Sequence, residues 1–375
     1  MVATPPPRIA RGQTIGVIAP AGPVRLDRLQ RGLTRLAETF AIKLAPSLVT
    51  PMFLDARGQT LAAAGTPTLV DDPREPIAPR SVAPRAGTEP GQGPVKLSLV
   101  PMPSDRPPLL AGVRESNLPS YLAASDATRA AELSALLADR DVRAIICARG
   151  GYGIMRMLSL VDPALLRADP KPIVGFSDAT ALLAWAHAAG VRGIHGPMVA
   201  QLADLSDGDV ARLVALLTDP APPGVRPWTL VAHGSGSVRG PLVPANLTLA
   251  SMLVGTPWPL PLDGAITLLE EIGERPYELD RYVTQLALTG QLARIGGVVL
   301  GDLTRCADAN PATGEQDPAD AALTTMLERF AAAGKPIAYG APIGHGTRNE
   351  AVPFGAPSIL DLEHGTLEIL EGAVR

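Results

Sequence analysis

The stretch from Pro172 to Gly190 places a serine and an aspartate between a strand pattern and a helix pattern. Its apolar start predicts a buried β-strand, and its later part predicts a helix. Ser177 and Asp178 stand at the turn between the two. One interpretation makes them ordinary helix N-caps. The other makes Ser177 a nucleophile, because such a turn holds a hydroxyl clear of its own backbone and beside the N–H groups of a helix start.

A serine nucleophile needs a general base, and the base needs a partner that fixes its tautomer. His345 is the strongest candidate base, because the flanking Gly344 and Gly346 let its imidazole project from a loop. A simple turn histidine is the alternative. Glu270 and Glu271 end an apolar run, where the alternation of strand side chains directs only one of them into a crevice. A solvated strand end is the alternative there.

The other histidines and the two cysteines give weaker candidates. His195 follows an apolar run and could line a crevice, although a structural histidine is favoured. Three more histidines are interpreted as packing or surface residues: His187, His233 and His364. Two cysteines, Cys147 and Cys306, cannot form a disulfide framework and have no metal-ligand spacing, so we expect both in the core.

A glycine-rich turn runs from Arg149 to Gly153. Gly150 and Gly151 can present backbone N–H groups to an anion or an oxyanion. The turn lacks both the dinucleotide-binding GxGxxG pattern and the Lys-Ser/Thr ending of a P-loop. Arg149 ends a predicted strand, so we expect it either to bind a substrate carboxylate or to form a salt bridge with an acid such as Asp178.

Alternating strand and helix patterns must position these residues. They predict a doubly wound α/β layer with a parallel sheet, whose ligand crevice lies at the carboxyl ends of the strands. The main predicted elements are a strand within Gln13–Val24, a helix over Arg25–Phe40, a helix within Ser120–Asp139 with Ser125 or Asp126 as its N-cap, and a strand over Val142–Ala148.

Proline and glycine mark the predicted domain boundaries. Residues 1–217 form an N-terminal α/β domain, 218–244 a linker, and 245–375 a smaller mixed α/β domain that carries Glu270 and His345. Residues from about 45 to 115 contain 13 prolines, and we interpret them as a flexible insertion that is dispensable for chemistry. Within it, the runs "TPMFLDA" and "VKLSLVPM" could pair as strands.

The bulk composition excludes several function classes. The net charge is -4 and no basic cluster stands beside aromatic residues, which argues against a nucleic-acid partner. No apolar run has the length of a signal peptide or of a membrane span. We therefore expect a cytoplasmic protein with no membrane partner.

Eight motifs occur in the order seen in one known family. They are "GQTIGVIAPAGPV", "YLAASDATRAAEL", "ICARGGYGIMRMLSLVD", "KPIVGFSDATALL", "HGPM", "NLTLASMLVGTP", "LLEEIGERPYELDR" and "GHGTRNEAVPFG". The chain resembles the LD-carboxypeptidases, serine peptidases that include muramoyltetrapeptide carboxypeptidase and the microcin C self-immunity hydrolase. The resemblance covers roughly 11–49 and 120–370.

The resemblance implies a Ser177–Glu270–His345 triad, an oxyanion hole made by Asp178 and the Gly150–Gly151 turn, and no metal or cofactor. The family's Leu-Glu-Asp is Leu-Glu-Glu here, which leaves the choice between Glu270 and Glu271 open. The expected activity is release of the terminal D-alanine from a murein tetrapeptide during cell-wall recycling, by a homodimer acting on a small peptide.

Two alternatives to this activity remain. One is an immunity-type hydrolase of a peptidyl-nucleotide antibiotic, and the other is a non-catalytic protein that binds muropeptides. Aromatic residues make up only 3% of the chain, which favours the carboxypeptidase over a hydrolase that must hold a nucleobase.

Overall fold

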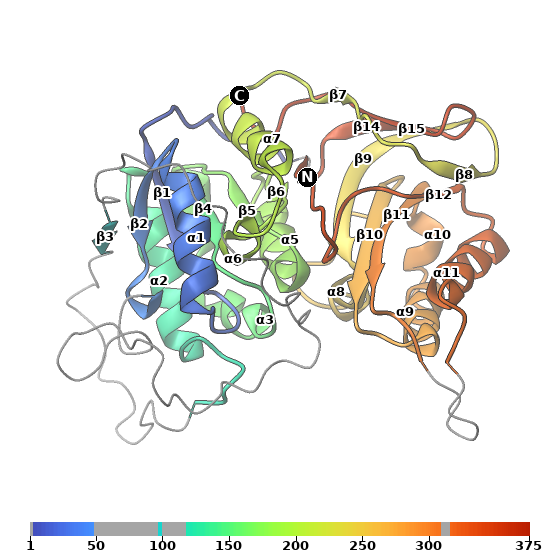
Figure 1. Ribbon diagram of the computed structural model, residues 1–375, viewed down its shortest axis with the longest axis horizontal. Coiled ribbons are helices and arrows are strands. Elements are labelled where there is room, and N and C mark those ends of the chain that lie inside the picture. The colour runs from blue at the N-terminus through green and yellow to red at the C-terminus, as the bar shows by residue number, and fades with distance from the viewer. Residues whose placement is uncertain (1–2, 49–96, 100–117, 309–315) are drawn as a thin grey trace, which may run out of the picture.

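The computed structural model of the chain describes residues 3–48, 97–99, 118–308 and 316–375. These residues form two α/β lobes, each built around its own sheet (Figure 1). Most of the predicted insertion, including the run "TPMFLDA", lies outside the described residues.

The first sheet has the strand order β13-β6-β5-β4-β1-β2-β3. All neighbours in it are parallel except β13, which runs antiparallel to β6. The order from β3 through β1 to β6 is that of a doubly wound sheet, so this prediction is confirmed. The strands are β1 (Thr14–Ile18), β2 (Ala41–Leu44), β3 (Leu97–Leu99), β4 (Val142–Cys147), β5 (Ile173–Gly175), β6 (Ile194–His195) and β13 (Val352–Pro353).

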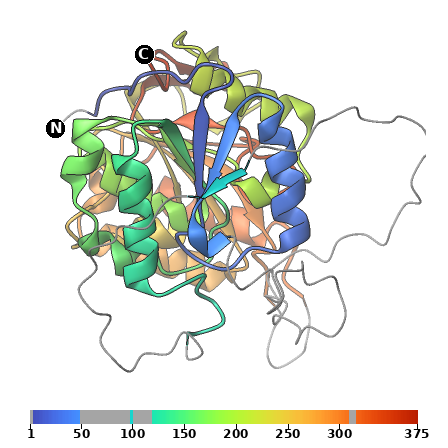
Figure 2. The same ribbon diagram turned by 90° about the vertical axis from the view of Figure 1, so that its left-hand side faces the viewer.

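Helices cover both faces of this sheet, with α1 on one side and α2 on the other (Figure 2). Leucines at helical spacing on α1 pack on one face, and Leu133, Leu136 and Leu137 of α2 pack on the other. Ser125 caps α2 by accepting from the Thr128 N–H at 3.1 Å, as one predicted alternative had it. The helices are α1 (Leu26–Ala37), α2 (Asp126–Ala138), α3 (Ile154–Met157), α4 (Pro163–Ala168), α5 (Thr180–Ala188), α6 (Val199–Leu202) and α7 (Asp207–Thr218).

The second sheet has the order β7-β15-β14-β9-β10-β11-β12-β8, with parallel neighbours from β9 to β12 and antiparallel ones elsewhere. Near the end of the chain, β14 and β15 form an antiparallel hairpin. The strands are β7 (Gly224–Val225), β8 (Val231–His233), β9 (Ser237–Asn246), β10 (Ile266–Ile272), β11 (Gly297–Thr304), β12 (Ile337–Tyr339), β14 (Pro357–Asp361) and β15 (Thr366–Ile369). The helices are α8 (Leu247–Met252), α9 (Pro276–Leu288), α10 (Gln291–Arg294) and α11 (Ala321–Ala332).

Two segments differ from the sequence interpretation. Residues 218–244, expected as a linker, carry β7, β8 and most of β9, so they belong to the second sheet. In the predicted insertion, β3 pairs with β2 in parallel, Ile42 opposite Leu97. Ser47 donates its N–H and hydroxyl to the buried Glu132, both at 2.7 Å. The start of the predicted insertion therefore packs on the first lobe.

The chain crosses between the lobes more than once. After β12 of the second sheet it returns to the first sheet as β13, where Val352 pairs with His195. Near the end of the chain, Arg192 donates to the Gly372 carbonyl at 2.8 Å. In the described ranges, every helix is too short or too polar to cross a membrane.

Candidate active site

Ser177 lies at the carboxyl end of β5 in a strained backbone conformation. Its φ is 60°, in the left-handed region, which costs a residue with a Cβ about 1–2 kcal/mol. Such strain persists where the surrounding structure imposes it, often at functional sites. The N-cap of α5 is Ala179, and no side chain caps that helix. The interpretation of Ser177 and Asp178 as N-caps of this helix is therefore wrong.

The glycine-rich turn lies directly against the serine hydroxyl. A Cβ on Gly150 would stand 3.3 Å from Ser177 Oγ, so a side chain there would crowd the hydroxyl. The Gly150 carbonyl accepts from the Gly22 N–H at 3.1 Å, which fixes the turn. Gly151 has a φ of 113°, a conformation that favours glycine.

Asp178 ties this turn to the serine. Its Oδ2 accepts from the N–H of Ile154, the first residue of α3, at 3.0 Å. Burial raises the pKa of Asp178 to about 7, against the effect of that hydrogen bond. The Asp178 N–H belongs to the first turn of a helical segment, where N–H groups lack an intrahelical acceptor. The predicted role of Asp178, Gly150 and Gly151 as an oxyanion hole stays a prediction.

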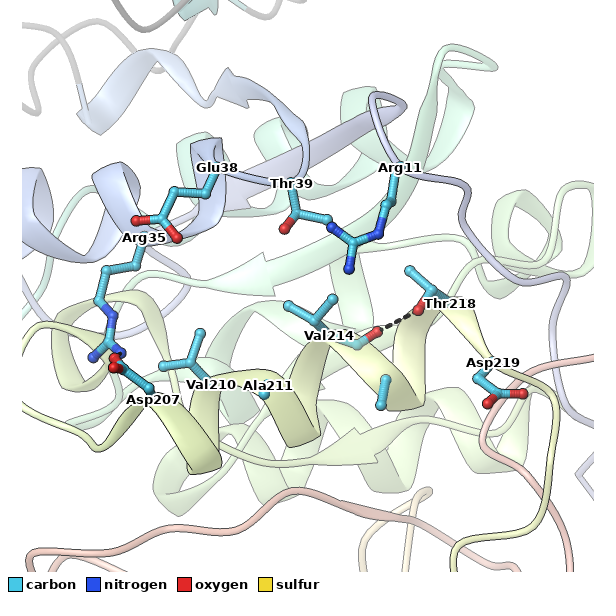
Figure 3. Close-up of a pocket in the computed structure, with 11 residues that line it drawn as sticks. Arg11, Arg35, Glu38, Thr39, Asp207, Val210, Ala211, Val214, Thr218 and Asp219 are labelled. Carbon is cyan, nitrogen blue, oxygen red and sulfur yellow. Dashed lines mark hydrogen bonds and ion pairs between the residues drawn. The ribbon is translucent and has the colours of Figure 1, made fainter. Parts of the chain in front are cut away.

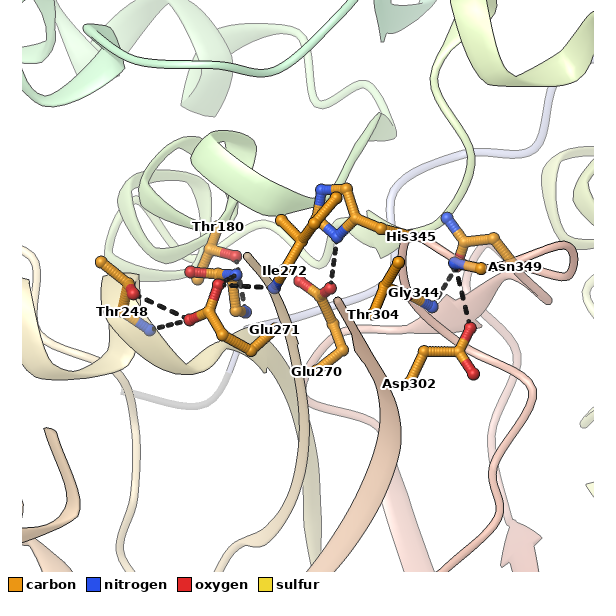
Figure 4. A network of polar contacts seen from close by, with 12 residues as sticks. Thr180, Thr248, Glu270, Glu271, Ile272, Asp302, Thr304, Gly344, His345 and Asn349 are labelled. Carbon is orange, nitrogen blue, oxygen red and sulfur yellow. Dashed lines mark hydrogen bonds and ion pairs between the residues drawn. The ribbon is translucent and has the colours of Figure 1, made fainter. Parts of the chain in front are cut away.

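His345 forms a hydrogen-bonded pair with Glu270. The distance from His345 Nδ1 to Glu270 Oε2 is 2.7 Å, and the Glu270 side chain is fully buried at the end of β10 (Figure 4). Burial alone would lower the pKa of His345, but the charge and hydrogen bond of Glu270 outweigh it, so the pKa is raised. A histidine in this setting is stabilised after it takes up a proton, which is what a general base requires.

The pair of His345 and Glu270 lies beside Phe176, the residue before Ser177. The ring centroids of His345 and Phe176 are 4.7 Å apart, and Phe176 leads into Ser177. The structure thus brings an imidazole and a carboxylate of the second lobe against Phe176 of the first lobe, next in the chain to Ser177.

Glu271 points away from His345 (Figure 4). Its carboxylate accepts from the Thr248 N–H and hydroxyl and from Asn246 Nδ2, each at 2.8 Å. Burial and the charge of Glu270 raise the pKa of Glu271 to about 7. Both glutamates are buried, so the alternative of a solvated strand end is wrong. Glu271 anchors the start of α8, whereas Glu270 contacts the histidine.

Gly344 and Gly346, which flank His345, lie so close to Asp302 that a side chain at either position would collide with it. Gly344 has a φ of 137°, and a Cβ there would meet Asp302 Cβ at 3.0 Å and Glu270 Cβ at 3.2 Å. A Cβ on Gly346 would overlap Asp302 Oδ2, which accepts from the Gly346 N–H at 3.1 Å. Sequence reasoning missed Asp302. Its only signal is its place near the end of β11, next to the strand that carries Glu270.

The remaining histidines pack or lie on the surface. Burial lowers the pKa of His195 to about 4, and its ring stands 5.9 Å from that of Phe176. Burial likewise lowers the pKa of His187 to about 4. His233 lies in β8, and the exposed His364 bonds to Asp361 in the β14–β15 turn. Cys147 and Cys306 are both buried, and burial raises the pKa of each thiol to about 12.

Arg149 is half-buried, and its Nη1 donates to the Pro23 carbonyl in the loop after β1 at 2.9 Å. Its two predicted roles stay predictions. Nearby, Tyr152 follows Gly151 in the turn and stands edge-on to Tyr121, with ring centroids 5.7 Å apart. These tyrosines are 55% and 51% exposed.

A separate cavity of about 400 Å³ lies between α1 and α7 (Figure 3). Arg11, Arg35 and Asp207 are among its lining residues, and none of Ser177, Glu270 or His345 is. Within the described ranges, no group of three or more histidine, cysteine, aspartate or glutamate side chains could hold a metal ion.

Comparison with known proteins gives matches along most of the chain. Residues 107–196 match the LD-carboxypeptidase N-terminal domain, and residues 239–360 match the LD-carboxypeptidase C-terminal domain. A Streptomyces coelicolor protein provisionally named a carboxypeptidase is 32% identical over 97% of this chain and 95% of its own length. The murein tetrapeptide carboxypeptidase of Pseudomonas aeruginosa is 31% identical over 64% of this chain and 80% of its own.

Solved structures show the same fold at lower identity. Muramoyltetrapeptide carboxypeptidase from Oxalobacter formigenes has a TM-score of 0.68 at 22% identity, covering 96% of this chain and 98% of that one. The microcin C7 self-immunity protein MccF has a TM-score of 0.70 at 18% identity, covering 99% and 100%. The two-lobed mixed α/β architecture is therefore shared with both.

Proposed function

The chain belongs to the LD-carboxypeptidase family, and on that premise we propose that it is a serine-type carboxypeptidase that releases terminal D-alanine from a murein tetrapeptide. The observation that carries this proposal is the 2.7 Å contact between His345 Nδ1 and Glu270 Oε2, with the His345 ring against Phe176, the residue that precedes the strained Ser177. This constellation has the parts of an acyl-transfer site: a nucleophile, a base and a group that orients the base.

The reaction begins when Ser177 Oγ attacks the carbonyl carbon of the last peptide bond and its proton passes to His345 Nε2. Glu270 holds the other ring nitrogen and stabilises the imidazolium that forms. The carbonyl oxygen becomes an oxyanion that accepts from the N–H groups of Asp178 and Gly150. The carbon–nitrogen bond then breaks as His345 returns the proton to the leaving amine of D-alanine. A water molecule, deprotonated by the same imidazole, hydrolyses the acyl-serine.

The direct test is incubation of the protein with a muramoyl tetrapeptide and measurement of free D-alanine. Ser177→Ala is the matched control, because it removes the hydroxyl and keeps the Cβ. We expect kcat to fall about 10⁴-fold or more while the melting temperature stays near that of the wild type. A folded Ser177→Ala variant with nearly unchanged kcat would refute the serine mechanism. A wild-type protein that releases no D-alanine would refute the substrate.

A second candidate is hydrolysis of a peptidyl nucleotide, as the likeness to the self-immunity protein suggests. The exposed pair of Tyr121 and Tyr152 favours it, because aromatic rings at a site's rim can stack on a nucleobase. An aminoacyl sulfamoyl adenosine incubated in parallel with the tetrapeptide separates the two. Faster cleavage of the nucleotide conjugate would replace the murein substrate with this one.

We also propose that the protein acts in the cytoplasm, in cell-wall recycling, and as a homodimer. Cell fractionation of the producing organism measures the location, and light scattering after size exclusion measures the oligomeric state, both independently of activity. Recovery from outside the cytoplasm, or a monomeric mass, would contradict them.

A further inference from the structure

Gly344, which precedes His345, is held by a closed ring of hydrogen bonds. The Gly344 N–H donates to Asn349 Oδ1 at 3.2 Å, and the Gly344 carbonyl accepts from Gln201 Nε2 at 3.1 Å. Asn349 Nδ2 closes the ring by donating to Gln201 Oε1 at 2.8 Å. Each side-chain amide both donates and accepts here, so each fixes the orientation of the other.

Gln201 is the member of this ring that belongs to the first lobe. It lies in α6, whose Ala200 N–H donates to the Ala148 carbonyl at 2.9 Å, at the end of β4. Two residues after Ala148 comes Gly150, which lies against Ser177 Oγ, and a Cβ on Gly150 would also meet Met198 at 3.1 Å. A short series of contacts therefore connects Gln201 to the turn beside the serine.

Farther along the loop, Arg348 forms an ion pair with Asp209 of α7 in the first lobe, at 2.9 Å. Apart from Gln201, the groups that hydrogen-bond to residues 344–346 themselves come from the same lobe as His345. Asp302 holds Gly346, Asn349 holds Gly344, and Glu270 holds the imidazole. These contacts shape the loop, but they do not relate it to Ser177. The ring contact with Phe176 does reach the first lobe, but it lacks the directionality of a hydrogen bond.

We propose that Gln201 is a positioning residue, which sets His345 relative to Ser177 through its hydrogen bond to the Gly344 carbonyl. The proposal rests on the triad of the proposed function. Proton transfer between Ser177 and His345 depends steeply on their separation, and a misplacement of about 1 Å can lower a rate about 100-fold. The loss of Gln201 should therefore affect the chemical step more than substrate binding.

The test compares Gln201→Met with Gln30→Met. Methionine keeps the length of glutamine and removes its strong hydrogen bonds, and Gln30 is an exposed residue of α1. For each variant, kcat and KM for D-alanine release are measured, together with the melting temperature. The second-order rate of Ser177 labelling by a fluorophosphonate is also measured. For Gln201→Met we expect kcat and labelling to fall at least about tenfold, with KM within about twofold and a melting temperature near the wild type. Gln30→Met should match the wild type in all four.

Two results would overturn the proposal. One is a folded Gln201→Met with kcat and labelling rate within about twofold of the wild type. The other is a loss of rate that only tracks a loss of folded protein. If Gln201→Met does not fold, Gln201→Glu replaces it, because a carboxylate still accepts from Asn349 but cannot donate to Gly344, and the same expectations apply. If the wild type releases no D-alanine, the proposed substrate fails, while labelling still tests Gln201 because it requires only the serine and its base.

Discussion

Glu270→Gln and Glu271→Gln form a matched pair, because the two residues are adjacent and buried. Each exchange replaces one carboxylate oxygen with an NH₂ group. In Glu270→Gln the amide removes the negative charge 2.7 Å from His345 Nδ1. It can also turn its NH₂ toward that nitrogen and hold the ring in the wrong tautomer. The corresponding exchange of aspartate for asparagine in a serine-protease triad lowers kcat about 10⁴-fold. We therefore expect a loss of about 10³–10⁴-fold, or about 4–5.5 kcal/mol of transition-state stabilisation.

Glu271→Gln should act on stability instead. The carboxylate accepts from Thr248 twice, from Asn246 and from the Ile272 N–H. An amide has a single oxygen, so at least one donor group loses its acceptor, at a cost of about 1–3 kcal/mol. The melting temperature should drop by roughly 2–4 °C for each kcal/mol, with kcat within a few-fold of the wild type.

The assay is D-alanine release at pH 8 together with thermal unfolding. That pH lies above the raised pKa of Glu271, about 7, so the wild-type carboxylate is ionised and the exchange removes a charge at both positions. The reasoning would be refuted if Glu271→Gln lost activity at an unchanged melting temperature while Glu270→Gln kept its kcat.

Four further predictions follow from the site. Because the pKa of His345 is raised, kcat/KM should fall on the acid side with a midpoint above the usual histidine pKa of about 6.5, as His345 takes up a proton; a midpoint below that value in the pH–rate profile contradicts this. Ser177→Gly should unfold in urea with about 1 kcal/mol more stability than Ser177→Ala, because glycine tolerates φ 60°; equal stability contradicts it. Gly346→Ala should lower kcat more than tenfold by displacing the base loop, whereas Gly208→Ala, with nothing but a serine hydroxyl within 4 Å, should not; equal kcat values contradict it. If Arg149 binds the substrate carboxylate, Arg149→Lys should lower kcat/KM for the free tetrapeptide and spare a C-terminally amidated analogue; equal losses contradict it.

Elements with strong local patterns were predictable from the sequence. The strand pattern of β5 and the leucine spacing of α1 are local, and so is the cap at Ser125. Local patterns were not enough to identify Ser177, Glu270 and His345 as candidate site residues, because each has a plausible structural role by itself. The order of eight motifs along the chain, rather than any physical property of one of them, brought these residues together.

Long-range contacts account for what the sequence did not reveal. Strand alternation predicted that only one of Glu270 and Glu271 would point into a crevice, but it did not reveal that both are buried. The register between β10 and β11 shifts between Leu269 and Glu271. The sequence gives no signal for Gln201 and Asn349, because the hydrogen bond between them forms only where the two lobes pack together. The pairing of Val352 with His195 joins segments 157 residues apart, so no window of sequence contains it.

The return of the chain to the first sheet as β13 has a consequence for protein synthesis. On the ribosome, Ser177 emerges first, while the loop that carries His345 follows 168 residues later, immediately before the strand that completes the first sheet. At about 5–20 residues per second, roughly 8–34 s separate the two. During that interval the nascent first lobe has an open edge at β6, and Ser177 is present without His345. The contact between His345 and Phe176 therefore forms only when almost the whole chain has been made, and a ribosome that stalls between the lobes leaves Ser177 without it.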